Sequence, residues 1–382
     1  MLLLVCCSSS DEPGPIIEPT PESENLLFGA DLSYVNQILD KGGVYKTDGT
    51  QKDPYAIFAE KGTSLARFRL WHNPVWTKEV YGASGTQLYS DLKDVEKSIS
   101  RSRTAGMQVL LDFHYSDTWA DPGKQAIPKA WIDIKSISVL EDSVYRYTKK
   151  TLQYLNAKGL MPEYVQLGNE TNCGTLYTDA PAGFPAGNAC NGQWINLGRV
   201  MKAGIRAVRE VADASAVKTK IILHVADPKN VEWYFNGLTT TATVTDFDVV
   251  GFSYYPLWHK TVGINEISNK ITEFKTKFQK EVIILETGYP WATSSNDNYN
   301  NLFGSGALPG YPFTEQGQYD FMVRLAKEVK AGGGIGLIYW EPAWITSPMK
   351  DLWGTGSSWE NVTFFNFEGN TIKGIDYMKF EY

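Results

Sequence analysis

Eight short apolar runs, separated by segments with helical spacing, constrain the fold of this chain more than any other feature. Most of the runs are continuously apolar rather than alternating, which is typical of parallel strands that are buried on both faces. The predicted strands span residues 26–32, 64–71, 107–114, 163–169, 220–225, 248–254, 281–286 and 335–340. Helices are predicted over residues 91–105, 139–158, 193–212, 264–279 and 315–331.

Strands that alternate with helices in this way predict an α/β fold, a single (β/α)8 TIM barrel. The alternative architecture, a doubly wound open sheet, normally shows a glycine-rich phosphate loop after its first strand. The corresponding residues here are Asp31-Leu32-Ser33-Tyr34, without a GxGxxG motif. We find no internal repeat and no second domain in the sequence, so the barrel is predicted to span residues 26–382.

The N-terminal residues predict export from the cytoplasm. Residues 1–7 are apolar and end in Cys6-Cys7, which resembles the end of a bacterial lipoprotein signal, where a cysteine is lipidated after cleavage. This stretch is too short to span a membrane. Residues 8–25 are rich in Pro, Ser, Asp and Glu, as a flexible tether is. We therefore expect a secreted protein or a cell-surface, outer-membrane lipoprotein anchored through Cys6 or Cys7. The alternative is a disordered N-terminus without an anchor.

Two further cysteines, Cys173 and Cys190, lie in a stretch rich in Gly, Pro and Ala. In an oxidising compartment they can form a disulfide that pins this stretch. The alternative is a pair of free thiols.

The charge and aromatic content of the chain narrow the class of partner. The formal net charge is −7 and there is no run of lysine or arginine, which argues against a nucleic-acid partner and favours a neutral substrate. The 12 Trp, 21 Tyr and 17 Phe residues can fill a core, but such rings also stack on sugar faces and so favour a carbohydrate. We expect a monomer that requires no cofactor.

Two glutamates end predicted strands at positions suited to catalysis. The active site of a TIM barrel lies at the C-terminal ends of its strands. Glu170 follows the fourth strand and Glu286 ends the seventh, and these strands face each other across the barrel. Glycoside cleavage needs one carboxylic acid to protonate the leaving oxygen and a second carboxylate to attack the sugar or activate water. The pair therefore predicts a glycoside hydrolase.

Neighbouring residues at the strand ends are candidates for supporting roles. Tyr254, by a hydrogen bond, and Arg69, by its charge, could each stabilise the anion of Glu286. Asn169 is expected to contact the 2-hydroxyl of the sugar.

Four more polar residues lie at these ends. His114 ends the third strand and His224 lies on the fifth, and both are expected to support the site. Asp112 is interpreted as structural, pointing inward one layer below His114, and Glu341 as a partner for Arg69.

Five sequence blocks carry a family resemblance. They are FRLWHNP (68–74), DFHYSDTWADPGKQ (112–125), GNETN (168–172), LETGYP (285–290) and YWEPAW (339–344). Together they resemble glycoside hydrolase family fifty-three, the arabinogalactan endo-β-1,4-galactanases. The resemblance implies endo-hydrolysis of β-1,4-galactan, the neutral side chains of pectin, with retention of configuration. It also implies that Glu170 is the acid/base and Glu286 the nucleophile.

The resemblance extends to residues that contact the substrate. It implies sugar subsites near the loop after the third strand, and stacking platforms on the last two loops, whose alternative role is loop packing. The implied residues are Asp117, Trp119, Asp121, Lys124, Trp291, Trp340 and Trp344.

Some bacterial members of the family carry a calcium ion between the last two loops. Ser295, Asp297, Tyr299 and Asn301 have the alternate spacing expected of oxygen ligands, so a structural calcium at Asp297 and Asn301 is a hypothesis.

Two other functions remain open at this point. The same fold and chemistry would serve a mannanase, a xylanase or a cellulase. A surface glycan-binding lipoprotein without catalysis would share the N-terminus and the aromatic content.

Overall fold

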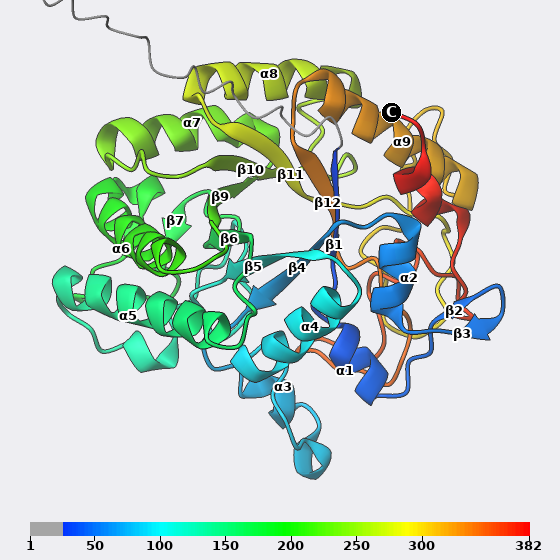
Figure 1. Ribbon diagram of the computed structural model, residues 1–382, viewed down its shortest axis with the longest axis horizontal. Helices are drawn as coiled ribbons and strands as arrows, with labels where there is room; N and C mark the ends of the chain where they lie inside the picture. Colours follow the sequence, from blue (N-terminus) through cyan, green and yellow to red (C-terminus); the bar gives the residue numbers. More distant parts are fainter. Residues whose placement is uncertain (1–25) are drawn as a thin grey trace, which may run out of the picture.

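Eight parallel strands close into a barrel in the computed structural model, which describes residues 26–382 (Figure 1). The barrel strands are β1 (Leu27–Asp31), β4 (Leu65–Leu70), β5 (Gln108–Phe113), β6 (Tyr164–Leu167), β9 (Lys220–Ala226), β10 (Val249–Ser253), β11 (Glu281–Thr287) and β12 (Gly336–Tyr339). Neighbours in the barrel follow each other along the chain, and β1 pairs with β12 to close it. The predicted TIM barrel is thereby confirmed, and the open sheet is wrong. The predicted lipoprotein-like segment 1–7 and tether 8–25 lie outside the described residues.

Helices surround the barrel on its outer side (Figure 1). They are α1 (Val35–Asp40), α2 (Pro54–Lys61), α3 (Trp76–Glu79), α4 (Leu92–Thr104), α5 (Ile137–Asn156), α6 (Trp194–Asp213), α7 (Val231–Asn236), α8 (Ile267–Phe278) and α9 (Glu315–Ala331). The five predicted helices correspond to α4, α5, α6, α8 and α9, whereas the shorter helices α1, α2, α3 and α7 were not predicted. After β12 a 3-10 helix, Lys373–Lys379, packs against α9 where a final α-helix would lie.

Side-chain caps explain where several helices begin. Asp53 accepts hydrogen bonds from the first turn of α2, which carries Pro54 at its first position. Asp91 and Thr314 cap α4 and α9 in the same way. These caps satisfy backbone N–H groups that have no partner within the helix, so α2, α4 and α9 start at defined residues.

The barrel interior is divided into an apolar floor and a polar upper part. Because side chains alternate along a strand, every second residue points inward. The floor consists of Leu65, Leu110, Tyr164, Ile222, Val249, Ile283, Leu285 and Ile338. Two residues further along four of these strands the inward side chains are Arg67, Asp112, Gln166 and His224, all at most 1% exposed. The floor thus closes the barrel on one side of a dry polar layer.

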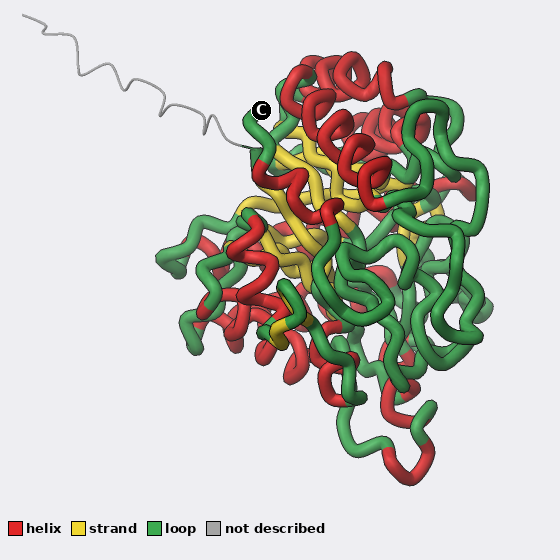
Figure 2. Tube along the Cα trace, turned by 90° about the vertical axis from the view of Figure 1, so that its right-hand side faces the viewer, coloured by secondary structure: helices red, strands yellow, loops and turns green. Residues whose placement is uncertain are grey.

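Long loops gather at the C-terminal ends of the strands. They connect β5 to α5, β6 to α6 and β11 to α9, and one more follows β12, whereas the connections from helices back to strands are short. Figure 2 shows most of the loops collected on one side of the molecule. The loop after β6 contains the small antiparallel sheet of β7 (Gly174–Thr175) and β8 (Gly187–Asn188), and another such pair, β2 (Lys46–Thr47) and β3 (Thr50–Gln51), lies outside the barrel.

The predicted disulfide between Cys173 and Cys190 is present. It joins the start of the loop that follows Glu170 to the segment just before α6, and it therefore shortens the free length of the loop that carries this glutamate.

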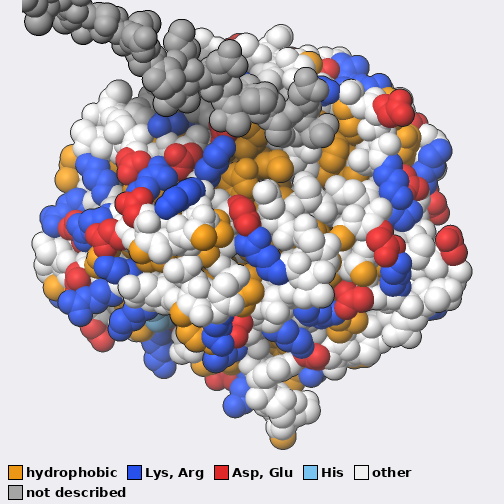
Figure 3. All heavy atoms as spheres, viewed as in Figure 1, with side chains coloured by type: hydrophobic (Ala, Val, Ile, Leu, Met, Phe, Trp, Pro, Cys, Tyr) orange, Lys and Arg blue, Asp and Glu red, His pale blue; other side chains and the backbone are white. Residues whose placement is uncertain are grey.

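The outer surface carries both signs of charge. On the face seen in Figure 3, basic and acidic side chains are interspersed over the helices. Within residues 26–382, none of the helices has the length and apolar character needed to cross a membrane.

Candidate active site

A left-handed turn at the end of β6 presents Glu170. Gly168 has φ +82° and Glu170 itself has φ +46°. A Cβ atom at position 168 would approach the Cγ2 atom of Thr171 to 2.6 Å, so this position requires glycine. A non-glycine residue with positive φ costs free energy, and such residues cluster at functional sites. The GNE sequence therefore turns the chain so that Glu170 enters the mouth of the barrel.

An irregularity in β11 aims Glu286. Ile283 and Leu285 point into the barrel, whereas Ile284 packs outside under the helices. Regular alternation would send Glu286 outward as well. The pairing register shifts at this point, so that Ile284 lies opposite Phe252 and Glu286 opposite the next residue of β10. A bulge of this kind redirects a side chain, and here it turns the carboxylate into the site.

Arg67 is the centre of the buried polar network. A guanidinium has five N–H donors, and the structure gives each of them an acceptor at 2.8–3.2 Å. The acceptors are the side-chain oxygens of Asp31, Asp112, Gln166, Asn169 and Glu286. Arg67 thus fixes the orientation of Glu286 and neutralises part of its charge.

This arrangement corrects the role predicted for Arg69. The Arg69 guanidinium pairs with Glu341, as predicted, and does not reach Glu286. It is packed over the rings of Tyr34 and Trp119, 4.0 and 4.3 Å from their centroids. Arg67 lies two residues earlier on the same face of β4, so it occupies the layer between the apolar floor and Arg69.

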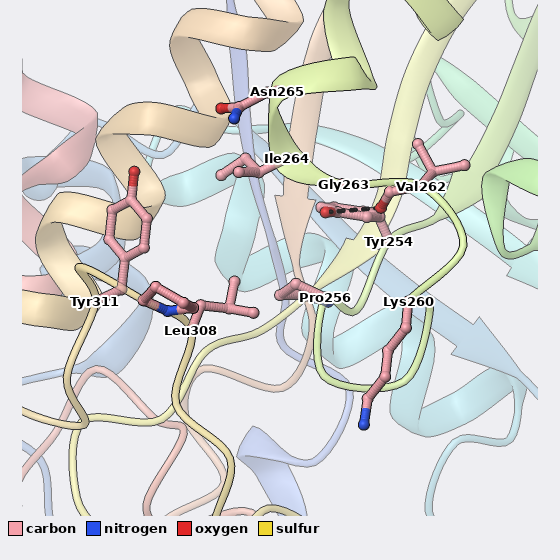
Figure 4. A pocket seen from close by; sticks show the side chains of 10 residues that line it. Tyr254, Pro256, Lys260, Val262, Gly263, Ile264, Asn265, Leu308 and Tyr311 are labelled. Carbon is pink, nitrogen blue, oxygen red and sulfur yellow. Dashed lines mark hydrogen bonds between the residues drawn. The ribbon is translucent and has the colours of Figure 1, made fainter.

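Tyr255 supplies the hydrogen bond that was predicted for Tyr254. The Tyr255 hydroxyl donates to Oε2 of Glu286 at 3.0 Å. Tyr254 points away from the glutamates into a pocket of about 470 Å³, where its hydroxyl donates to the carbonyl of Val262 at 3.2 Å (Figure 4). The reason is strand parity: Ser253 points inward, so Tyr254 points outward and Tyr255 inward.

The two glutamates differ in how their charge is stabilised. Burial raises the pKa of both, and for Glu170 the nearby charge of Glu286 raises it further, well above the usual range. At Glu286 the Arg67 charge and the Tyr255 hydroxyl oppose this rise. Glu170 receives one side-chain hydrogen bond, from Ser253 at 2.6 Å. The environment of Glu170 therefore favours its protonated form, whereas Arg67 and Tyr255 favour the ionised form of Glu286.

His224 lies beneath Glu170, fully buried on β9. Its Nε2 is 2.9 Å from the Ser253 hydroxyl, and its Nδ1 is 3.0 Å from the amide nitrogen of Gln166. Burial, followed by the Arg67 charge, lowers the pKa of His224 well below its usual value. The predicted supporting role of His224 thus has a definite geometry.

Two residues of the DFHYSD block hold loops rather than face the site. His114 is 2% exposed, and its Nδ1 accepts from the Trp71 indole, while its Nε2 lies 3.1 Å from Asp112. Asp117 accepts backbone N–H groups of Asn73 and Lys129, at 2.9 and 2.8 Å. The inward, structural interpretation of Asp112 is confirmed, because its carboxylate accepts from Arg67 in the lower layer.

Two further residues of that block, Asp121 and Trp119, lie near Glu170 and Arg69, respectively. Asp121 is close enough for its charge to raise the pKa of Glu170, and its backbone pairs with that of Lys124 in a tight turn. The ring of Trp119 lies over Arg69, with its centroid 6.0 Å from that of Trp340. Both tryptophans are partly exposed.

The aromatic residues of the last two loops have different environments. Trp344 is only 3% exposed and its indole donates to the carbonyl of Gly356, so its predicted role as a stacking platform is wrong. Trp291 packs against Phe367, with ring centroids 4.8 Å apart. Trp258, which was not predicted to contact substrate, is 49% exposed, and its ring centroid lies 5.1 Å from that of Tyr255.

Comparison with known proteins identifies the family of this chain. Residues 27–378 match glycosyl hydrolase family 53. The chain belongs to glycosyl hydrolase family 53. It is 40% identical over 373 residues to the arabinogalactan endo-β-1,4-galactanase of Cellvibrio japonicus, covering 96% of this chain and 94% of that protein. The endo-β-1,4-galactanase of Bacillus subtilis is 33% identical, over 88% of this chain and 76% of its own. The family 53 catalytic domain of Ignisphaera aggregans superposes with a TM-score of 0.81 at 32% identity, over 95% of this chain and 98% of that one.

The residues considered for a calcium ion take part in hydrogen bonds within and between the last two loops of this family 53 chain. Among residues 26–382 no group of three or more His, Cys, Asp or Glu side chains is arranged to hold a metal ion. Asp297 accepts backbone N–H groups of Tyr299 and Ser357, and Asn301 bonds to Ser295. Glu360 accepts from the N–H of residue 296. The two loops are thus joined directly by hydrogen bonds, and the calcium hypothesis has no support.

Proposed function

We propose that this family 53 enzyme cleaves internal linkages of β-1,4-galactan, the neutral side chain of pectic arabinogalactan, with retention of configuration. The observation that carries the proposal is the buried pair of Glu170 and Glu286, of which only Glu286 is bound by a guanidinium. The two galactanase relatives support galactan as the sugar.

In the first step Glu170 acts as the general acid. It donates its proton to the glycosidic oxygen while the Glu286 carboxylate attacks the anomeric carbon, which gives a covalent glycosyl–enzyme and a free chain end. Arg67 and Tyr255 hold Glu286 as an anion in the correct orientation for attack. Their hydrogen bonds weaken as the negative charge passes into the new ester bond, so they must be strong enough to position the group without trapping it.

In the second step Glu170 acts as the general base. Now a carboxylate, it takes a proton from water, and the water attacks the anomeric carbon from the face that the first product has left. Glu286 departs as a carboxylate, again stabilised by Arg67. Because each step inverts the anomeric centre, the product keeps the β configuration.

Substrate contacts are assigned to side chains around the pair. One N–H of the Asn169 amide donates to the carbonyl of Ala120 at 2.8 Å, which leaves its second N–H for the 2-hydroxyl of the sugar. Trp119 and Trp340, whose ring centroids lie 6.0 Å apart, serve as stacking surfaces. Asp121 and Lys124 supply polar contacts from the loop after β5.

A substrate panel tests the proposed activity. Purified enzyme is incubated with linear galactan, mannan, xylan and cellulose, and the release of reducing ends is measured over time. We expect release from galactan, with products of intermediate length appearing first, and loss of release in Glu170→Ala and Glu286→Ala. Faster cleavage of another glycan would reject galactan as the substrate. Binding of galactan without any release of sugar would favour the non-catalytic glycan-binding alternative.

We also propose that the enzyme works outside the cytoplasm as a lipid-anchored monomer. The disulfide supports an oxidising compartment, and the lipoprotein-like sequence around Cys6 and Cys7 supports the anchor. Mass spectrometry of the N-terminal peptide from a membrane fraction should find an acylated cysteine. An unmodified N-terminus on a fully soluble protein would contradict the anchor, and analytical ultracentrifugation would decide whether the chain is monomeric.

A further inference from the structure

A chain of three side chains runs from the barrel interior to the acid/base. His224 on β9, Ser253 on β10 and Glu170 after β6 are linked in that order, with Nε2 to Oγ at 2.9 Å and Oγ to Oε1 at 2.6 Å. His224 and Ser253 are both 0% exposed, so water does not compete for these hydrogen bonds. No step of the proposed reaction requires either residue to touch the sugar.

The partners of His224 determine which of its nitrogens carries the proton. The backbone N–H of Glu170 lies 3.2 Å from Nδ1, and the Oδ1 atom of Asn169, which cannot donate, lies 3.0 Å from it. This Asn169 oxygen already accepts from Arg67 and Gln166, whereas within the described residues the Glu170 N–H has no other acceptor. Nδ1 is therefore the acceptor and the proton is on Nε2. The Nε2–H group then donates to the oxygen of Ser253, and the hydroxyl hydrogen of Ser253 is directed at Glu170.

The two carboxyl oxygens of Glu170 have different surroundings. Oε1 accepts the Ser253 hydrogen bond, and within residues 26–382 the structure gives Oε2 no hydrogen-bond partner. We propose that Ser253, oriented by His224, is a positioning residue that engages Oε1 and thereby leaves Oε2 as the oxygen that carries the transferable proton. The inference rests on the proposed role of Glu170 as acid/base.

Ser253 also stabilises the charged form of Glu170. A hydroxyl that donates to a carboxylate favours the ionised state, and this state forms in the first step and acts as the base in the second. The other groups that face Glu170 are Glu286 and Asp121, which disfavour its ionisation, and Arg67, which favours it. Within residues 26–382, Ser253 is the side chain that donates a hydrogen bond to the Glu170 carboxyl group, whereas Tyr255 donates to Glu286.

The test is a titration of Glu170 in wild type, Ser253→Ala and a matched control. Carbon-13 labelling of the glutamate carboxyl groups, with the Glu170 signal assigned from Glu170→Gln, follows its ionisation without any substrate. We expect its midpoint in Ser253→Ala to rise by about one pH unit, since a hydrogen bond to a charged group is lost. The basic limb of the kcat/KM profile on galactan should rise by the same amount. Azide, which needs no base, should accelerate turnover of this variant on an activated aryl galactoside.

Thr171→Val is the matched control. Thr171 is also buried beside the acid, but its hydroxyl contacts the His224 carbonyl and the Tyr234 hydroxyl rather than the carboxyl group. It should lose stability without moving the Glu170 midpoint. An unchanged midpoint in Ser253→Ala, or an equal shift in Thr171→Val, would overturn the proposal.

Two further results keep this test separate from the proposed function. Should Ser253→Ala not fold, Ser253→Cys keeps a weaker donor in the same place. It should give a smaller upward shift, and an unshifted midpoint in that variant would also overturn the proposal. A wild-type enzyme that cleaves no galactan would reject the proposed function, while the substrate-free titration would still decide whether Ser253 acts on Glu170.

Discussion

Replacing Tyr255 by Phe removes one hydrogen bond from the nucleophile and keeps the ring. The hydroxyl donates to Oε2 of Glu286 over 3.0 Å at a site where both residues are at most 5% exposed. A hydrogen bond to a charged group contributes about 1.5–3 kcal/mol, and roughly 1.4 kcal/mol corresponds to one pH unit. Loss of this donor disfavours the carboxylate form, so we expect the pKa of Glu286 to rise by about one to two units.

The assay is the pH dependence of kcat/KM on linear galactan. Glu286 must be ionised for attack, so its higher pKa moves the acidic limb of the profile to higher pH. At the optimum kcat/KM should fall by less than the roughly 10- to 100-fold that the full hydrogen-bond energy would give, because this bond weakens in the transition state. Tyr254→Phe is the matched control, because it removes a neighbouring hydroxyl that donates to the carbonyl of Val262 rather than to Glu286. An unmoved acidic limb in Tyr255→Phe, or an equal shift in Tyr254→Phe, would refute the reasoning.

Three other perturbations have defined outcomes. Arg67→Lys reduces five N–H donors to three, so two buried acceptors lose their hydrogen bonds at a cost of about 1–3 kcal/mol each. The free energy of unfolding in urea should fall by roughly 2–6 kcal/mol, and activity should fall strongly. An unfolding midpoint equal to that of wild type would contradict the network. Replacing Cys173 and Cys190 together by Ala should lower the free energy of unfolding by about 3 kcal/mol, as expected for a closed loop of this length, and reducing agent should have the same effect on wild type but none on the variant. Excess chelator should leave the melting temperature unchanged, and a clear fall would restore the calcium hypothesis.

Much of the fold could be predicted from periodicity. The strands are buried on both faces and therefore appear as continuous apolar runs, and the longer helices repeat their apolar positions over several turns. Helices α1, α2, α3 and α7 were not predicted because they have 6, 8, 4 and 6 residues, too few turns for a helical period to stand out. The 3-10 helix after β12 was not predicted either, because its 7 residues are too few to show a helical period.

The site was predictable in position but not in its exact contacts. Placing Glu170 and Glu286 at strand ends required only the strand boundaries. Assigning Tyr255 instead of Tyr254 required the parity of β10, where a shift of one residue moves a side chain to the other face. The sequence alone could have indicated Tyr255, because it lies an even number of residues from the inward-pointing positions of β10. The bulge that turns Glu286 inward depends on pairing between two strands, which a single sequence does not reveal.

Azide products of the two glutamate variants test the central claim most directly. Azide replaces the missing group in each case, and the configuration of the galactosyl azide formed from an activated aryl galactoside is read by proton NMR. With Glu170→Ala azide attacks the glycosyl–enzyme, so the account predicts the β-azide. With Glu286→Ala azide takes the place of the nucleophile, so the account predicts the α-azide. The opposite pairing of variants and products would contradict the assignment of Glu170 as acid/base and Glu286 as nucleophile.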